Sequence, residues 1–161
     1  MSTSIFVRID SIKGESRERG HEDEIEAVSW SWGVAQAAGP VGPGRGGGAG
    51  RVGRPTFSDF TFVHDVDAAT PLLLKACATG QHLPKARVTV RKAGHGQHDF
   101  LVIELTEVSV SSVVTSIGAE ADGGDEVVVL SFAKVVLDYV PQGADGRPQP
   151  AIRFTHDLRT R

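Results

Sequence analysis

The sequence predicts a mainly β protein, an antiparallel sandwich or barrel. Residues 5–12 alternate Ile5, Val7 and Ile9 with bulky or charged neighbours, which is the period of a β-strand. Further segments rich in Val, Ile and Phe follow, separated by turn signals such as KAGHGQ and AEADGGDE. Only one segment has the features of a helix, which is too few for a parallel sheet built of βαβ units.

The strands are expected in order along one domain, residues 1–161. The charged segment KGESRERGHEDE, between the first two strands, is expected to be an exposed loop. Residues 39–55 and the tail 141–161 are expected to be irregular. The expected strands cover residues 5–12, 24–36, 57–64, 87–91, 99–107, 108–116 and 127–140.

The segment DAATPLLLKACATG predicts a short helix. Asp67 or Thr70 can cap its start, Pro71 is tolerated in a first turn, and Gly80 can end it in a left-handed conformation. The expected buried face consists of Leu72, Leu73, Ala76 and Cys77. We interpret Cys77 as a small core residue and not as a reactive thiol.

Composition argues against several partners. With 161 residues and a net charge of −3, the chain has no polybasic signature, so we expect neither nucleic acid nor a membrane surface as its main partner. Its single cysteine permits no intrachain disulfide. No apolar run approaches the roughly 20 residues that a membrane-spanning helix needs. The first residues, MSTSIFVRID, are typical of a strand and not of a Sec signal peptide.

No motif predicts an enzyme, and we expect no catalytic residue, cofactor or metal. Serines are frequent, but no G-x-S-x-G segment precedes a helix. His95 and His98 flank a polar turn, where solvated histidines are more common than metal ligands. The glycine-rich segment GRGGGAGR lacks the Lys and Ser/Thr of a phosphate-binding loop, and a strand follows it.

The segment AVSWSWGV, residues 27–34, alternates large and small residues. On a regular strand, Val28, Trp30, Trp32 and Val34 share one face, and Ala27, Ser29, Ser31, Gly33 and Ala35 share the other. The first face is a packing surface. The second is either a wall kept free of bulk or a plain solvated face, and spacing alone does not decide between them.

The glycine-rich segment has two further interpretations. It is a mobile loop, because many glycines raise the entropy cost of any ordered form. Alternatively, it becomes ordered only against a partner, with Arg45, Arg51 and Arg54 available for polar contacts.

Several segments together resemble the Hcp family, the hemolysin-coregulated proteins of type VI secretion systems. They are IFVRIDSIKGES, HEDEIEAVSWSWGVAQ, GGGAGRV, ATPLLLKACATGQHLPKA, VTVRKAG, IELTEVSVSSVVTS and LSFAKVVLDYVPQGADG, in the family's order and over nearly the whole chain. One departure is near the C-terminus. The family often ends in a Gly-Trp-Asp-like segment, where this chain has Thr155-His156-Asp157.

The resemblance implies a two-sheet antiparallel β-barrel with one short flanking helix, like a phage tail-tube protein. It implies hexameric rings that stack head to tail into a tube, with a spike protein at the tip, a contractile sheath outside and small effectors in the channel. The tube would be cytoplasmic before firing and then secreted by the machine itself. A tail-tube protein of a phage-like contractile particle is the alternative.

Residue roles follow from the resemblance together with the alternation. Ser29 and Ser31 are expected to face the channel, and Trp30 and Trp32 to anchor the core. The residues expected to make ring-stacking contacts are Arg45, Gly46, Gly47, Gly48, Arg51 and Arg54.

Overall fold

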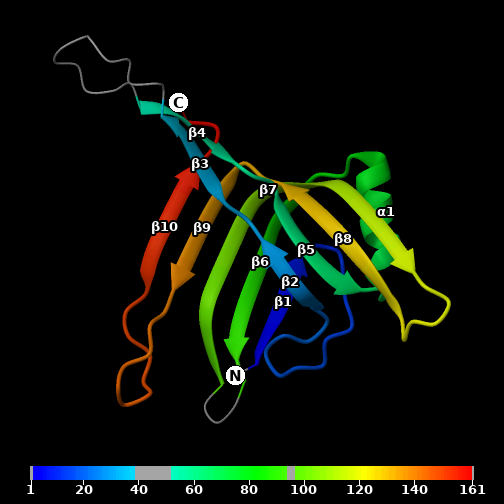
Figure 1. The fold of residues 1–161 in the computed structure, drawn as a ribbon, viewed down its shortest axis with the longest axis horizontal. Helices are drawn as coiled ribbons and strands as arrows, with labels where there is room; N and C mark the ends of the chain where they lie inside the picture. The colour runs from blue at the N-terminus through cyan, green and yellow to red at the C-terminus, as the bar shows by residue number, and fades with distance from the viewer. Residues whose placement is uncertain (1, 39–51, 94–96, 161) are drawn as a thin grey trace.

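The computed structural model describes residues 2–38, 52–93 and 97–160. Within these ranges the chain forms strands and one helix (Figure 1). In chain order the elements are β1 (Thr3–Ile9), β2 (Ile25–Ser31), β3 (Val34–Ala38), β4 (Val52–Phe57), β5 (Phe60–Asp65), α1 (Thr70–Thr79), β6 (Leu83–Lys92), β7 (His98–Ile117), β8 (Gly124–Ser131), β9 (Lys134–Tyr139) and β10 (Ile152–Asp157).

The predicted antiparallel barrel with one flanking helix is confirmed. The main sheet has the order β10-β9-β7-β6-β1-β2-β5-β8, and β7 also pairs with β8. This second pairing closes a barrel of six strands, from β7 through β6, β1, β2 and β5 to β8, which leaves no open edge within the barrel. Strands β9 and β10 extend the sheet beyond the barrel, whereas β3 and β4 form a separate two-stranded sheet (Figure 1).

Strand β7 makes this closure possible because it is long enough to pair with different strands along its two halves. Its first half pairs with β6 and β9, and its second half pairs with β8. Between the halves, Glu107 has a positive φ of 54°, and a bulge follows between Val110 and Ser112. The boundary expected between two strands at 107/108 is therefore a bend within one strand.

The core fills the barrel with side chains from alternate positions of each strand. Val7 lies opposite Val88, which lies opposite Ile103, and all three are fully buried. Phe60 and Phe62 on β5 and Leu130 on β8 fill the other side. Burial alternates regularly on β5, whereas Phe6 on β1 and Thr89 on β6 are buried on the opposite side from the core residues beside them. The alternation of apolar residues in the sequence is still sufficient to locate the three strands.

Helix α1 covers one end of the barrel, and most of its predicted features are present. Pro71 lies in the first turn and Gly80 ends the helix with φ 64°, as expected, and Leu73 is buried. The prediction for Leu72 is wrong: it is 40% exposed, because it lies about 100° around the helix from Leu73. Cys77 is partly buried against the core.

The helix start also differs from the prediction. Ala69 occupies the capping position, and no side chain caps the helix. Asp67 and Thr70 instead stabilise the preceding turn: Asp67 Oδ1 accepts from the Ala69 amide at 2.8 Å, and Thr70 Oγ1 accepts from the Asp67 amide at 3.1 Å.

Two loop predictions and three strand predictions are wrong in part. Residues 152–157 of the expected irregular tail form β10, which pairs along its whole length with β9. Residues 52–55 of the glycine-rich segment belong to β4, and 39–51 lie outside the described residues. The expected strands 24–36, 57–64 and 127–140 are each interrupted where the chain turns, at residues 32–33, 58–59 and 132–133.

The charged segment after β1 is not a wholly exposed loop. Ser16, His21 and Glu24 are buried, because this segment folds back over the outside of the barrel. The close packing of this segment requires glycine at position 14, because a Cβ there would lie 2.6 Å from the Glu24 carbonyl oxygen. The glycine of KGES thus permits close contact between the segment and the start of β2.

Candidate functional site: the small-residue sheet face and the arm

One face of the barrel wall carries small and aliphatic side chains that point away from the core. It is formed by β2, β5, β8 and the second half of β7. Phe60, Phe62 and His64 are fully buried, so the residues that alternate with them in β5 point outward, namely Thr61, Val63 and Asp65. The strand registers align three rows across this face, namely Ser31, Thr61, Val129 and Ser112; Ser29, Val63, Val127 and Val114; and Asp65, Asp125 and Ser116.

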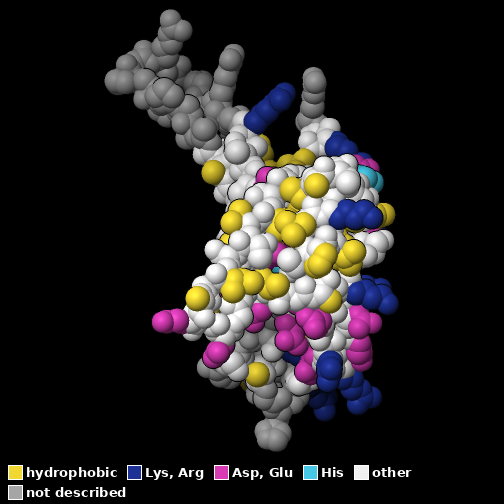
Figure 2. All heavy atoms as spheres, turned by 90° about the vertical axis from the view of Figure 1, so that its right-hand side faces the viewer, with side chains coloured by type: hydrophobic (Ala, Val, Ile, Leu, Met, Phe, Trp, Pro, Cys, Tyr) yellow, Lys and Arg dark blue, Asp and Glu magenta, His cyan; other side chains and the backbone are white. Residues whose placement is uncertain are grey.

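We call these residues the small-residue face. Two rows are neutral and hold only Ser, Thr and Val, whereas the third is acidic. Val114 is 59% exposed and Val127 is 36% exposed. From the side that carries α1 and β8, Figure 2 shows hydrophobic side chains across the middle of the surface, with acidic side chains below them. The three rows themselves contain no bulky side chain and no Lys or Arg.

Ser29 and Ser31 are both exposed on this face, and a β-bulge determines which of their neighbours join them. The register of β2 against β5 shifts between Ala27 and Ser29, so Val28 is an extra residue. Ala27 therefore packs against the core, and Val28 is 63% exposed. The prediction that placed Ala27 with the serines and Val28 with the tryptophans is wrong for this reason.

The predicted packing position of Val34 is also wrong, since it is 53% exposed. The chain leaves the barrel after Ser31, and Val34 lies in β3, which does not pair with the main sheet. The alternation in β2 therefore does not predict on which side Val34 lies, because Val34 belongs to a different strand.

Trp30 and Trp32 are partly buried and pack against the core cluster. Trp30 stacks on Phe60 with ring centroids 5.5 Å apart and an angle of 12°. Trp32 stacks on Phe57 at 5.9 Å, at the point where the chain leaves the barrel. Their predicted anchoring contribution to stability remains a prediction.

Strands β3 and β4 form what we call the arm. At its base, the Gly33 amide donates to Ser58 Oγ at 2.9 Å, and the Ser58 amide donates to the Gly33 carbonyl at 2.9 Å. Arg54 is exposed on β4. Of the other residues expected in ring stacking, Arg45, Gly46, Gly47, Gly48 and Arg51 lie outside the described residues.

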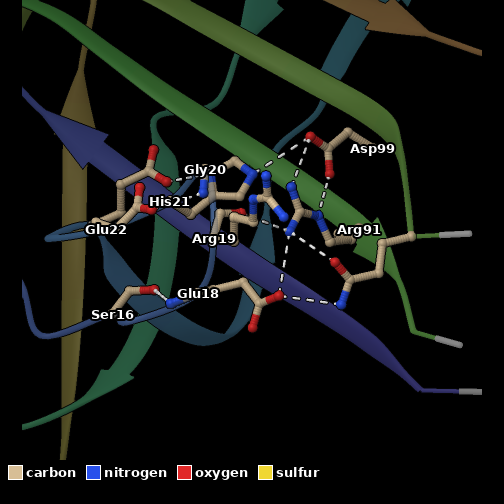
Figure 3. A network of polar contacts seen from close by, with 10 residues as sticks. Ser16, Glu18, Arg19, Gly20, His21, Glu22, Arg91 and Asp99 are labelled. Carbon is tan, nitrogen blue, oxygen red and sulfur yellow. Dashed lines mark hydrogen bonds and ion pairs between the residues drawn. The ribbon is translucent and has the colours of Figure 1, made fainter.

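A polar network on the outside of the barrel holds the segment between β1 and β2 in place (Figure 3). Arg91 Nε donates to Asp99 Oδ1 at 2.7 Å, and Arg91 Nη1 donates to the Arg19 carbonyl at 3.2 Å. His21 stacks on Phe6 with centroids 4.4 Å apart, and its Nδ1 contacts Glu24. Its Nε2 lies 3.4 Å from Asp99 Oδ2.

The electrostatics of this network are those of a structural ion pair. Partial burial tends to raise the pKa of Asp99, but the hydrogen bond and the charge of Arg91, assisted by His21, outweigh it and lower that pKa. Sequence reasoning missed the network, because its members come from segments separated by more than 70 residues.

A second polar group is enclosed in the barrel. His64 Nε2 lies 2.8 Å from Glu126 Oε1, and Thr115 Oγ1 donates to Glu126 Oε2 at 2.6 Å. His64 Nδ1 lies 3.4 Å from Asp67 Oδ2. Burial tends to lower the pKa of His64, but hydrogen bonds with Asp67 and Glu126 outweigh it and raise that pKa. His64 and Glu126 are fully buried, which suits a structural role and gives no access to a substrate.

Across the described residues, no three His, Cys, Asp or Glu side chains are arranged to hold a metal ion. No helix among them has both the length and the apolar character needed to cross a membrane. The geometry as a whole is that of a closed β-barrel that carries the small-residue face on its outer wall and an arm that does not pair with the main sheet, which defines the class of the protein as a β-barrel with a projecting two-stranded sheet.

Comparison with known proteins identifies the family. Residues 6–139 match the model described as "Type VI secretion system effector, Hcp". The chain is 44% identical over 147 residues to Protein hcp1 of Pseudomonas aeruginosa, covering 91% of this chain and 88% of that protein. The chain therefore belongs to the Hcp family of type VI secretion proteins, which is a family of structural components and not of enzymes.

Solved structures agree with this assignment. Hcp1 from Salmonella typhimurium is 32% identical, with a TM-score of 0.78 over 99% of this chain and 96% of that one. A type VI secretion system effector from Yersinia pestis is 31% identical, with a TM-score of 0.76 over 95% and 98% of the two chains.

Proposed function

We propose that this protein forms hexameric rings that stack head to tail into the inner tube of a type VI secretion system. In this proposal a spike protein sits at the tube tip, a contractile sheath surrounds the tube, and small effectors bind in the channel. The tube is cytoplasmic before firing and is then secreted. The protein has no catalytic role and binds neither nucleic acid nor the membrane interior.

The small-residue face is the observation that carries this proposal, beyond membership of the family. A channel wall must let a protein cargo move without trapping it. Rows of Ser, Thr and Val offer few hydrogen bonds and no deep pocket, and they present no bulky side chain that would narrow the channel. We therefore assign Ser29 and Ser31, with the neighbouring rows of this face, to the channel.

The arm supports the stacking part of the proposal. A ring is a closed heterologous interface, whereas stacked rings need a second interface that repeats along an axis. A projecting two-stranded sheet that is not hydrogen-bonded to the main sheet is suited to reach a neighbouring ring. We assign the segment that joins β3 to β4, together with Arg54 on β4, to this contact.

Light scattering coupled to size exclusion tests the assembly state directly. We expect a native mass six times the chain mass of 17.1 kDa. A monomer at micromolar concentration would contradict spontaneous ring formation. Co-expression with an effector encoded beside this gene then tests the cargo role, and an effector that elutes apart from the ring would count against it.

A further inference from the structure

The arm is attached to the barrel through its base and not through sheet hydrogen bonds. Its chain leaves the barrel after Ser31 and returns at Phe60. A two-stranded hairpin alone is at best marginally stable in water. The hydrogen bonds between Gly33 and Ser58 join its two strands to each other and do not tie them to the main sheet. Another set of contacts must fix its direction.

An aromatic cluster lies at this base, which we define as Trp32, Phe57, Phe132, Phe154 and His156. Trp32 has ring centroids 6.3 Å from Phe132 and 6.3 Å from Phe154. His156 stacks on Phe57 of the arm at 4.5 Å, with an angle of 28° between the rings. These separations lie within the range of favourable aromatic pairs, about 4.5–7 Å.

Two of these rings come from β10. This strand is fixed to the barrel through β9, where Phe154 lies opposite Leu137 and His156 lies opposite Val135. Val135 is fully buried and Leu137 packs against the core, so β10 has a firm support. Figure 1 shows the end of β10 beside the base of β3 and β4.

We propose that β10 is a positioning strand for the arm. Phe154 packs against Trp32, and His156 packs against Phe57. Through these contacts the C-terminal strand sets the direction in which the arm projects. This gives a role to His156, which lies in the segment Thr155-His156-Asp157 where this chain departs from the Gly-Trp-Asp-like ending. The role rests on contacts within one chain and does not require the proposed tube.

The two tryptophans make a spectroscopic test possible. The chain has only Trp30 and Trp32, so in a Trp30→Phe background Trp32 is the sole indole reporter at the arm base. In that background, His156→Ala should shift Trp32 emission to longer wavelength and increase its quenching by acrylamide. Amide exchange of Arg54, Thr56 and Phe57 should rise roughly three- to tenfold, the effect of losing one aromatic pair.

Two further variants separate positioning from general stability. His156→Phe keeps a ring against Phe57 and should restore both the emission and the exchange rates. Ile152→Ala is a matched control, because Ile152 lies on the same face of β10 but is 64% exposed and outside the cluster. It should leave Trp32 unchanged.

Two results would overturn the proposal. One is unchanged Trp32 emission and exchange in His156→Ala. The other is exchange that rises equally in β6 and β4, which would show loss of the barrel and not release of the arm. All these measurements work on single rings or monomers. Absence of rings in the parent protein would therefore count against the proposed function and not against the positioning role.

Discussion

His64 and Glu126 form a hydrogen-bonded pair inside the barrel, with 2.8 Å between Nε2 and Oε1 and both side chains fully buried. The pair links β5 to β8, next to the point where β7 closes the barrel. A buried charge pair is costly to break, because removal of one partner leaves the other without compensation. The barrel closure therefore depends on a polar contact as well as on apolar packing.

Replacement of Glu126 by Gln should destabilise the barrel in a pH-dependent way. The expected loss is about 1–3 kcal/mol near pH 6. Because the folded state raises the pKa of His64 above 6.5, its protonated form stabilises the fold below that value. This contribution is lost as the pH rises through the raised pKa. Chemical denaturation at pH 6 and pH 9 should show the gap between parent and variant narrowing at the higher pH.

The control for this experiment is Glu120→Gln, a change of the same type in the exposed turn before β8. It should be close to neutral at both pH values. A gap between parent and Glu126→Gln that is equal at pH 6 and pH 9 would contradict the role of His64 protonation.

Replacement of Asp99 by Asn should loosen the segment between β1 and β2. Asp99 is 36% exposed, so solvent screening limits the expected loss to about 1 kcal/mol. The folded state lowers the pKa of Asp99 below 3.8, so its contribution is present above that pH and is lost as the pH falls through the lowered value. Urea denaturation and amide exchange of residues 16–24 measure both effects. Asp122→Asn is the control, and equal exchange in the two variants would refute the role of Asp99.

Replacement of Trp30 by Ala should cost about 3 kcal/mol, the lower end of the range for large aromatic side chains in cores. The reason is its stack on Phe60 and its partial burial against the core. Val28→Ala, two residues earlier and 63% exposed, should change stability by less than about 0.5 kcal/mol. Thermal unfolding of both variants checks this, and equal melting temperatures for Trp30→Ala and the parent would show that Trp30 is no anchor.

Replacement of Ser31 by Gln tests the channel assignment. Ser31 is exposed on the small-residue face, so a longer side chain should leave folding and ring mass unchanged while it narrows the proposed channel. We expect less effector to co-purify with the ring. Thr155→Gln is the matched change on β10, at the far end of the sheet order. Equal effector recovery with both variants would contradict a channel position for Ser31.

The sequence predicts the parts of this fold that depend on local pattern. Alternation locates β1, β5 and β6, and Pro71 with Gly80 locates α1. It also places Ser29 and Ser31 on one face, because their spacing within β2 is regular. The resemblance to a known family adds the barrel, which the strand pattern alone left open between a sandwich and a barrel.

What the sequence did not predict depends on contacts between distant segments. The bulge at Val28 has no local signature, yet it moves Ala27 to the core side and Val28 to the surface. Strand β10 alternates over only six residues and is mostly exposed, and pairing with β9 gives it its structure. His64 and Arg91 each have a partner far away in sequence, Glu126 and Glu18, so these two contacts could not be inferred from spacing.

Shortening the arm tests ring stacking most directly. Ala38 lies opposite Val52 in the β3–β4 register, so a two-residue Asn-Gly turn can replace residues 39–51 without disturbing the strands. The barrel and the small-residue face are unaffected by this change, so we expect single rings of normal mass. Tubes should be lost, because the replaced segment contains most of the residues assigned to the contact between rings.

A Gly-Ser linker of the same length as 39–51 separates the effect of the length of the segment from that of its sequence. The protein with this linker should also fail to form tubes if Arg45 and Arg51 make the contact. Electron microscopy of the parent and both variants measures this, and tubes of normal length from the shortened arm would exclude the segment from stacking.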